Sequence, residues 1–266
     1  MRRMLCPTIR RCLCVFATLM LFHSHSGAAV LDWNTVTWAD GSLNNSYQAD
    51  PADPISGITI DVTANGGAPL VPWSGAPNPM TPTVARAFQG GLPTIENSLT
   101  LAVDLSNAAT QSITVNISFA STGGATDVSF QIFDIDAGGP YQDQLSQIYA
   151  VGLDGTLIAP TITTSQNNTL IGAGLGQSVV GTATTPDTGP NSGRANVTIS
   201  FGTNLIQSLT FTYGGTGAYP DPAYQHFGVG NINFTPVPEV NPALLSAFSC
   251  LAAVGLIWRH RARMRK

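Results

Sequence analysis

Hydrophobic and polar residues alternate with a period of two along most of the chain between residues 30 and 235. The clearest run is 113–119, where isoleucine, valine and phenylalanine alternate with threonine, asparagine and serine. Such alternation is typical of a strand with one face in a core and the other in solvent. Similar runs occupy 58–62, 99–103, 128–132, 148–151, 197–201, 209–213 and 227–234. We therefore expect roughly eight to ten short strands.

This pattern predicts an all-β fold, an antiparallel β-sandwich resembling a jelly roll, because the body shows no amphipathic helical stripe and Gly, Pro, Asn or Asp bound its strands. A β-helix is the rival architecture, but it requires a short repeat of fixed period, which the sequence lacks. Residues 64–91 contain five prolines and are predicted to form a long surface loop, as are residues 182–193.

The N-terminus has the composition of a secretory signal peptide. Arg2, Arg3, Arg10 and Arg11 lie ahead of the apolar run from Cys12 to Phe22, and small residues follow at 26–29. We expect cleavage just before Ala29 or Val30, so that residues 1–29 are the signal peptide and residues 30–235 the mature body. A retained N-terminal anchor is the alternative.

The C-terminal tail, residues 236–266, has three parts: a proline-containing motif at 236–242, an apolar segment at 243–258 and a basic end at 259–266. As a helix, the apolar segment is about 24 Å long, slightly short of the roughly 30 Å hydrocarbon core of a bilayer. The basic residues predict a membrane stop that stays on the cytoplasmic face. They are Arg259, Arg261, Arg263, Arg265 and Lys266. An ordinary C-terminal membrane anchor would show the same apolar and basic parts.

The tail resembles the PEP-CTERM sorting signal of Gram-negative bacteria, in which a Pro-Glu-Pro motif, a short membrane helix and an Arg-rich end direct a secreted protein to an exosortase. The motif residues are Pro238, Glu239, Val240, Asn241 and Pro242, with the second proline displaced from the commonest pattern. The resemblance covers the tail only. It implies an exosortase-type processing enzyme as partner, and an exported protein that begins as an inner-membrane precursor and ends in the cell envelope, at the surface or outside. It also implies association with extracellular polysaccharide.

Cysteine and charge set the body apart from both ends. All four cysteines lie in the signal peptide or the tail, so the body must be stabilised by its core or by a bound ion. Arg86 and Arg194 are its only basic residues against fourteen acidic ones, which gives a net charge of −12. Such a surface repels phosphate backbones, which excludes nucleic-acid binding, and favours divalent cations as partners.

The body offers little for catalysis. His226 is its only histidine and Glu96 its only glutamate. Ser/His/Asp hydrolysis would depend on His226, for which a structural role at the start of the last strand is the commoner explanation. A glycosidase needs two carboxylates in a set geometry, and Glu96 has no evident partner in the sequence. We therefore expect a protein that is not an enzyme.

The most site-like stretch is 133–143. In a strand, Asp134 and Asp136 project from the same face, and the turn at 138–140 would bring Asp143 back toward them. Calcium binds such oxygen clusters loosely in extracellular proteins, which makes calcium the candidate cofactor. Asp154 is either a fourth ligand or a hairpin residue. A solvated acidic turn explains the same stretch equally well. The EF-hand motif is rejected because its twelfth position is Leu145 instead of glutamate.

Exposed aromatic residues in loops suggest a ligand site of another kind. Trp73 and Tyr219 lie in proline-containing loops, where a ring face could stack on a sugar. Two hypotheses follow. The first is an exported, surface-sorted, non-enzymatic envelope or matrix protein associated with exopolysaccharide, and the second is a carbohydrate-binding or carbohydrate-active β-sandwich protein.

Overall fold

The computed structural model describes residues 27–73, 79–86, 96–182, 193–219, 222 and 224–238. Nearly all of the predicted signal peptide and the tail beyond Pro238 lie outside these ranges. The described residues form sixteen strands and one short 3-10 helix, η1, Gly174–Gly176. The strands are β1 Ala29–Leu31, β2 Asn44–Gln48, β3 Gly57–Asn65, β4 Thr83–Ala85, β5 Ser98–Val103, β6 Ser112–Phe119, β7 Ala125–Phe133, β8 Asp143–Gly152, β9 Leu157–Ile158, β10 Thr161–Thr164, β11 Asn168–Ile171, β12 Ser178–Gly181, β13 Val197–Gly202, β14 Ile206–Gly215, β15 Gln225–Val229 and β16 Ile232–Pro236.

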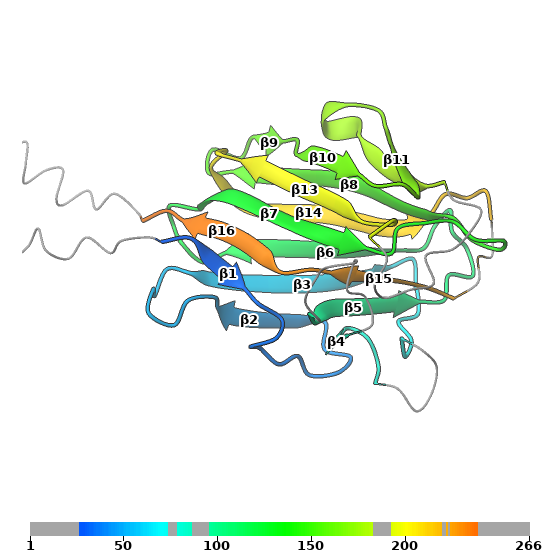
Figure 1. The fold of residues 1–266 in the computed structure, drawn as a ribbon, viewed down its shortest axis with the longest axis horizontal. Coiled ribbons are helices and arrows are strands. Elements are labelled where there is room, and N and C mark those ends of the chain that lie inside the picture. Colours follow the sequence, from blue (N-terminus) through cyan, green and yellow to red (C-terminus); the bar gives the residue numbers. More distant parts are fainter. Residues whose placement is uncertain are drawn as a thin grey trace, which may run out of the picture.

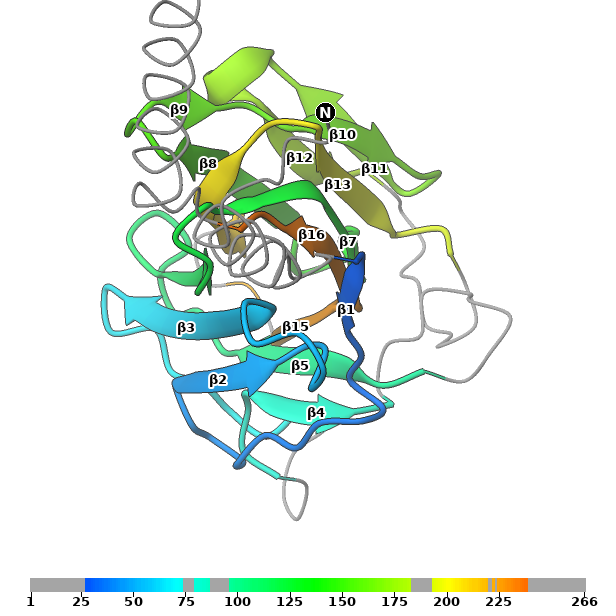
Figure 2. The same cartoon turned by 90° about the vertical axis from the view of Figure 1, so that its left-hand side faces the viewer.

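The strands form one antiparallel sheet that curls into two layers (Figures 1 and 2). In the first layer the order is β2-β3-β6-β14-β8-β12-β11, and β9 pairs with β8. In the second layer the order is β4-β5-β15-β7-β13-β10. There β16 continues β15 along the same edge of β7, and β1 pairs with β16. The layers are joined at the ends of two central strands, where Ile206, the first residue of β14, pairs with Ala125, the first residue of β7.

The core lies between the two layers because each strand turns its alternate apolar side chains inward. Four aromatic contacts join them: Phe211 of β14 lies 5.9 Å from Phe130 and 6.3 Å from Phe227, measured between ring centroids. Tyr213 stacks on Phe227 at 4.3 Å, and Phe119 of β6 lies 5.0 Å from Phe234 of β16. These contacts, with the uniformly antiparallel pairing, confirm the predicted all-β antiparallel fold; jelly-roll connectivity stays a prediction.

The predicted runs lie in strands, but the described residues form sixteen strands instead of the expected eight to ten. Two segments also differ in detail. The run 227–234 forms two strands, since it breaks at Gly230 and Asn231 between β15 and β16. The segment 64–91, predicted as a loop, contains β4 and contributes the bridges Leu70 to Val103 and Pro72 to Met80. Its prolines are compatible with pairing at this position because β4 lies at the edge of its layer, where an unpaired backbone nitrogen is tolerated.

Both ends of the described body leave the fold at the same side. β1 at the start pairs with β16 at the end, Ala29 opposite Phe234 (Figure 1). Beyond β16, the backbone nitrogen of Val237 donates to Gly124 O at 2.9 Å, and the Ser121 hydroxyl donates to the Val237 carbonyl. No helix in the described ranges is long and apolar enough to span a bilayer, and the predicted membrane helix 243–258 falls outside them.

Candidate functional site

The outer face of the second layer carries two rows of polar side chains. Alternation turns Val128, Phe130 and Ile132 of β7 into the core, so Ser129 and Gln131 point to the opposite face. The strand register extends each row across neighbouring strands. Asn233 of β16 and Ser200 of β13 flank Ser129, and Thr198 lies opposite Gln131. The result is a sheet surface of amides and hydroxyls.

A pocket of about 340 Å³ opens on this face, within the size range of small-molecule sites. Its lining comes from β1, β7, β13 and β16, from the break between β15 and β16, and from Glu96, which lies just before β5. The lining residues are Val30, Glu96, Ser129, Phe130, Gln131, Phe133, Thr198, Gly230, Asn231 and Asn233. Among them only Glu96 carries a charge. The described lining therefore combines polar and apolar surface with one negatively charged side chain.

Glu96 is held at the pocket by a chain of hydrogen bonds. Asn231 accepts the Trp33 backbone N–H at its Oδ1, 3.0 Å away, which fixes the orientation of its amide. Its Nδ2 consequently donates to Glu96 Oε2 at 3.3 Å. The neighbouring Asn97 is tied to the same segment, because its backbone nitrogen donates to Asn34 Oδ1 at 3.1 Å. The carboxylate is thus positioned before any ligand arrives.

An aromatic side chain and a glycine shape one part of the pocket. Phe133 ends β7 on the same outward face as Gln131, and it is 3% exposed. A Cβ at Gly230 would lie 2.8 Å from the Phe133 ring, so only glycine leaves room for the ring where it is. The indole nitrogen of Trp33 donates to the Gly230 carbonyl at 2.9 Å and holds this backbone in place.

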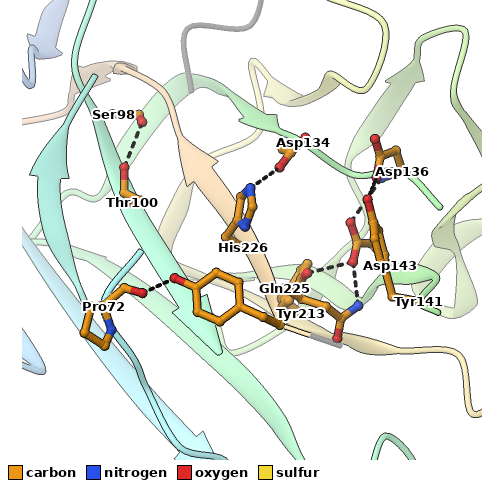
Figure 3. A network of polar contacts seen from close by, with 11 residues as sticks. Pro72, Ser98, Thr100, Asp134, Asp136, Tyr141, Asp143, Tyr213, Gln225 and His226 are labelled. Atoms are coloured by element: carbon orange, nitrogen blue, oxygen red, sulfur yellow. Dashed lines mark hydrogen bonds and ion pairs between the residues drawn. The ribbon is translucent and has the colours of Figure 1, made fainter. Parts of the chain in front are cut away.

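The predicted calcium stretch forms a second polar assembly, which we call the strand-end cluster: Asp136, Tyr141, Asp143, Tyr213 and Gln225 (Figure 3). Asp143 is 2% exposed, and its Oδ1 accepts the Tyr213 hydroxyl and Gln225 Nε2, each at 2.7 Å. Its Oδ2 accepts the backbone N–H of Asp136 at 3.2 Å. Asp136, 1% exposed, accepts the Tyr141 hydroxyl at 3.0 Å. The turn that returns the chain is confirmed, since Gly138 N donates to Tyr141 O.

Burial dominates the electrostatics of the strand-end cluster. It raises the pKa of Asp143 well above the ordinary value, although the hydrogen bond from Tyr213 acts in the opposite direction. Burial also raises the pKa of Tyr213, and the adjacent Asp143 adds to that effect. The pKa of Tyr141 is raised by burial first and by Asp136 second. These hydroxyls therefore stay protonated and act as donors.

The four predicted calcium ligands occupy different surroundings. Asp136 and Asp143 belong to the strand-end cluster, whereas Asp134 pairs with His226, Oδ2 to Nε2, at 3.0 Å (Figure 3). Asp154 lies in the turn between β8 and β9, where its Oδ1 accepts the Thr156 backbone N–H at 3.0 Å, as the hairpin interpretation expects. Across the described ranges, no three His, Cys, Asp or Glu side chains form a group suited to a metal ion. Calcium binding stays a prediction.

The predicted aromatic ligand residues lie away from the pocket lining. Trp73 is half-buried and follows Pro72, whose carbonyl accepts the Tyr224 hydroxyl. Tyr219 is 37% exposed, in the loop that follows β14. Of the sorting motif only Pro238 is described; Glu239 to Pro242 and the basic end fall outside the described residues.

Sequence reasoning missed the pocket. The alternation in β7 already placed Ser129 and Gln131 on an outward face, so that part of the signal was present. Val30, Glu96 and Asn231 come from distant parts of the chain, and only the pairing of β1 with β16 and the bonds from Trp33 bring them together. Strand pairing over such separations has no local sequence signature.

No family model and no curated protein matches this sequence. Among solved structures, a family 11 carbohydrate-binding module from Clostridium thermocellum in complex with a β-1,3-1,4-mixed-linked tetrasaccharide is similar over 81% of this chain and 99% of its own, with 13% identity and a TM-score of 0.32. The Caldicellulosiruptor saccharolyticus CBM27-1 module in complex with mannohexaose is similar over 80% and 99%, with 11% identity and a TM-score of 0.37.

The N-terminal domain of a Streptococcus gordonii adhesin is similar over 79% of this chain and 48% of its own, with 12% identity and a TM-score of 0.36. Identities and TM-scores this low assign to this chain neither a family nor a ligand.

Proposed function

We propose that the protein is a non-catalytic carbohydrate-binding protein of the cell envelope, which holds a segment of polysaccharide in the pocket on the outer face of β7, β13 and β16. The lining of the pocket carries this proposal. Amide and hydroxyl side chains each donate and accept hydrogen bonds, as sugar hydroxyls do. Gln131, Thr198 and Asn233 present such groups from three neighbouring strands.

The carboxylate content of the pocket supports binding over hydrolysis. Glycosidases generally need two carboxyl groups, about 5 to 10 Å apart, one on each side of the scissile bond. Among the described residues that line the pocket, Glu96 alone has a carboxyl group. The pocket is suited to holding a glycan that it does not cut.

Delivery to the cell envelope follows from the sequence at the two ends. We infer export through the signal peptide 1–29, membrane retention by the segment 243–258 with its basic end, and processing by an exosortase-type enzyme at the motif 238–242. The mature protein then lacks residues 243–266. Intact-mass measurement on envelope and released fractions tests this, because a mature surface form that still contained the apolar segment would leave only the ordinary membrane anchor.

The binding proposal is tested with the full chain in mild detergent, titrated with a panel of neutral and amino-sugar hexasaccharides. Asn233→Ala combined with Gln131→Ala removes two amides from the pocket, at about 0.5 to 1.5 kcal/mol for each lost hydrogen bond. We expect binding at least about tenfold weaker. Gln207→Ala, an exposed amide of β14 in the first layer, is the matched control and should bind like the wild type. Equal affinity of all three proteins for a bound glycan would place the site elsewhere.

A further inference from the structure

We propose that the pocket selects glycans that carry free amino groups, such as partly or fully deacetylated hexosamine polymers. This rests on the proposed function and names its ligand class. The observation behind it is the position of Glu96, the single charged side chain among the described lining residues, which otherwise carry amides, hydroxyls, glycine and apolar groups. A lone carboxylate in such a lining forms its strongest contact with a positively charged donor, because charge-assisted hydrogen bonds are about twice as strong as neutral ones.

The carboxylate is held in place for that role. Asn231 cannot turn its amide without losing the bond from the Trp33 backbone, so its Nδ2 continues to face Glu96 Oε2. Asn97 holds the backbone beside Glu96 through Asn34 Oδ1 and, with its own side chain, through the Trp33 carbonyl at 3.4 Å. An ammonium group that enters the pocket therefore meets a carboxylate that the fold already holds in one orientation, so little side-chain entropy is lost on binding.

The net charge of the body also favours binding of cationic glycans. Neither Arg86 nor Arg194 lines the pocket, and no other basic residue exists between residues 30 and 235. The body carries a net charge of −12. This field raises the local concentration of cationic polymers and lowers that of uronic acid polymers. Anionic polysaccharides would meet repulsion at long range and the like charge of Glu96 at the pocket.

The experiment compares three hexasaccharides on the full chain in mild detergent: hexa-glucosamine, its fully N-acetylated form and a hexa-uronate. All titrations are run in the same buffer near pH 6. Glu96→Gln removes the charge while keeping the side-chain length. Asp104→Asn is the matched control, because Asp104 is exposed and lies outside the pocket lining. Each of the two substitutions removes one negative charge.

We expect the wild type to bind hexa-glucosamine at least tenfold more tightly than the N-acetylated form and not to bind the uronate. Glu96→Gln should remove most of that preference and change binding of the N-acetylated form less than twofold, whereas Asp104→Asn should preserve the preference. The preference should also shrink as salt is raised, since the amine reaches a solvent-accessible carboxylate.

Three results would overturn this inference. If Glu96→Gln and Asp104→Asn lost the same affinity for hexa-glucosamine, binding would reflect general attraction between a polycation and an acidic protein. Equal affinity for both hexosamine forms, unchanged by Glu96→Gln but weakened by Asn233→Ala with Gln131→Ala, would reject amine selection and leave the proposed function standing. Binding of no glycan in the panel, or binding that those pocket substitutions leave unchanged, would reject the proposed function as well.

Discussion

The pocket and the strand-end cluster are built from the same kinds of residue, yet the structure uses them in opposite ways. In the strand-end cluster, Asp143 is 2% exposed and accepts three hydrogen bonds from within the protein. In the pocket, Gln131 makes a weak bond of 3.3 Å to Thr198, and Asn233 is exposed. A polar group whose bonds are satisfied internally stabilises the fold, whereas one that faces solvent is available to a ligand.

The outer face of the first layer supports the same distinction. It is also rich in threonine and asparagine, but its side chains bond to one another across strands. Thr114 and Thr212 lie 3.0 Å apart, oxygen to oxygen, and Thr212 also donates to Gln147 Oε1 at 3.1 Å. Thr210 donates to Asn116 Oδ1. Composition alone therefore does not separate a binding face from a self-bonded one.

The largest effect is expected from Asp143→Ala. This substitution leaves the Tyr213 hydroxyl and Gln225 Nε2 without their buried acceptor, and each unsatisfied buried donor costs about 1 to 3 kcal/mol. We expect a loss of about 3 kcal/mol or more in the free energy of unfolding, measured by urea denaturation.

The matched control for Asp143 is Asp154→Ala. Asp154 is exposed and bonds only within its turn, to Thr156 in the described structure, so its removal should cost less than about 1 kcal/mol. If Asp143→Ala were no more destabilising than Asp154→Ala, the strand-end cluster would not be a structural element.

The second prediction concerns calcium binding. The sequence predicted a calcium site at carboxylates that, in the structure, accept hydrogen bonds from within the protein. If calcium binds only the folded state at Asp134, Asp136 and Asp143, a hundredfold excess over its dissociation constant stabilises the fold by about 2.7 kcal/mol. The expected result is a higher melting temperature in calcium than in chelator, abolished by Asp134→Ala with Asp136→Ala. Equal melting temperatures of the wild type in both buffers would reject the site, and magnesium controls for screening of the acidic surface.

The raised pKa of Asp143 predicts a pH dependence of stability. The folded state keeps the proton at pH values where the unfolded chain, with the ordinary pKa of 3.8, has released it. Raising the pH above 3.8 therefore lowers the contribution of Asp143 to stability until its raised pKa is passed, by at most about 1.36 kcal/mol per pH unit.

Asp143→Asn cannot titrate, so the stability of the wild type relative to this variant should fall as the pH rises through that range. Urea unfolding of both proteins between pH 4 and 7 measures the difference. A difference that is constant or that rises with pH would contradict the burial of an ionisable carboxyl at this position.

The smallest effect on stability is expected in the pocket itself. Asn233→Ala combined with Gln131→Ala removes outward side chains that hold no buried group, so the free energy of unfolding should change by no more than about 0.5 kcal/mol for each substitution. The same variant should lose glycan binding. Thermal unfolding beside the binding titration checks both. A loss of stability comparable with that of Asp143→Ala would show that the two assemblies are not functionally distinct.

The sequence predicted the strands well and the pocket poorly, for a physical reason. Period-two alternation is a local consequence of a half-buried sheet, so runs such as 113–119 and 197–201 identify strands and their inward faces directly. The turn at 138–140 is local in the same sense. Which strands become neighbours is decided by packing of the whole core, and the pairs Ala29 with Phe234 and Ser98 with Ala85 depend on it.

The candidate sites show the same limit. The turn that brings Asp143 close to Asp136 was predicted correctly. The strand expected through Asp134 and Asp136 was wrong, because β7 ends at Phe133 and Asp134 has a φ of 67°. The sequence could not show that Tyr213 and Gln225, from strands far along the chain, would occupy the oxygens of Asp143. Glu96 was set aside for lack of a partner. Its partner is Asn231, 135 positions later. Asn231 lies in the break between β15 and β16, which the sequence pattern predicted as one continuous strand.

The attachment of β16 has a mechanical consequence. This strand is bonded to β1 on one edge and to β7 on the other, and its end is tied to the 121–124 turn through Val237. If, as proposed, the protein is tethered at the surface through its C-terminus and holds a polymer that is dragged by flow, tension would run along the axis of β16. Hydrogen bonds between antiparallel strands lie perpendicular to that axis, so the pull shears many of them at once instead of unzipping them singly. Asn233 lies on the same strand, so a polymer bound at the proposed site would be close to the line of force.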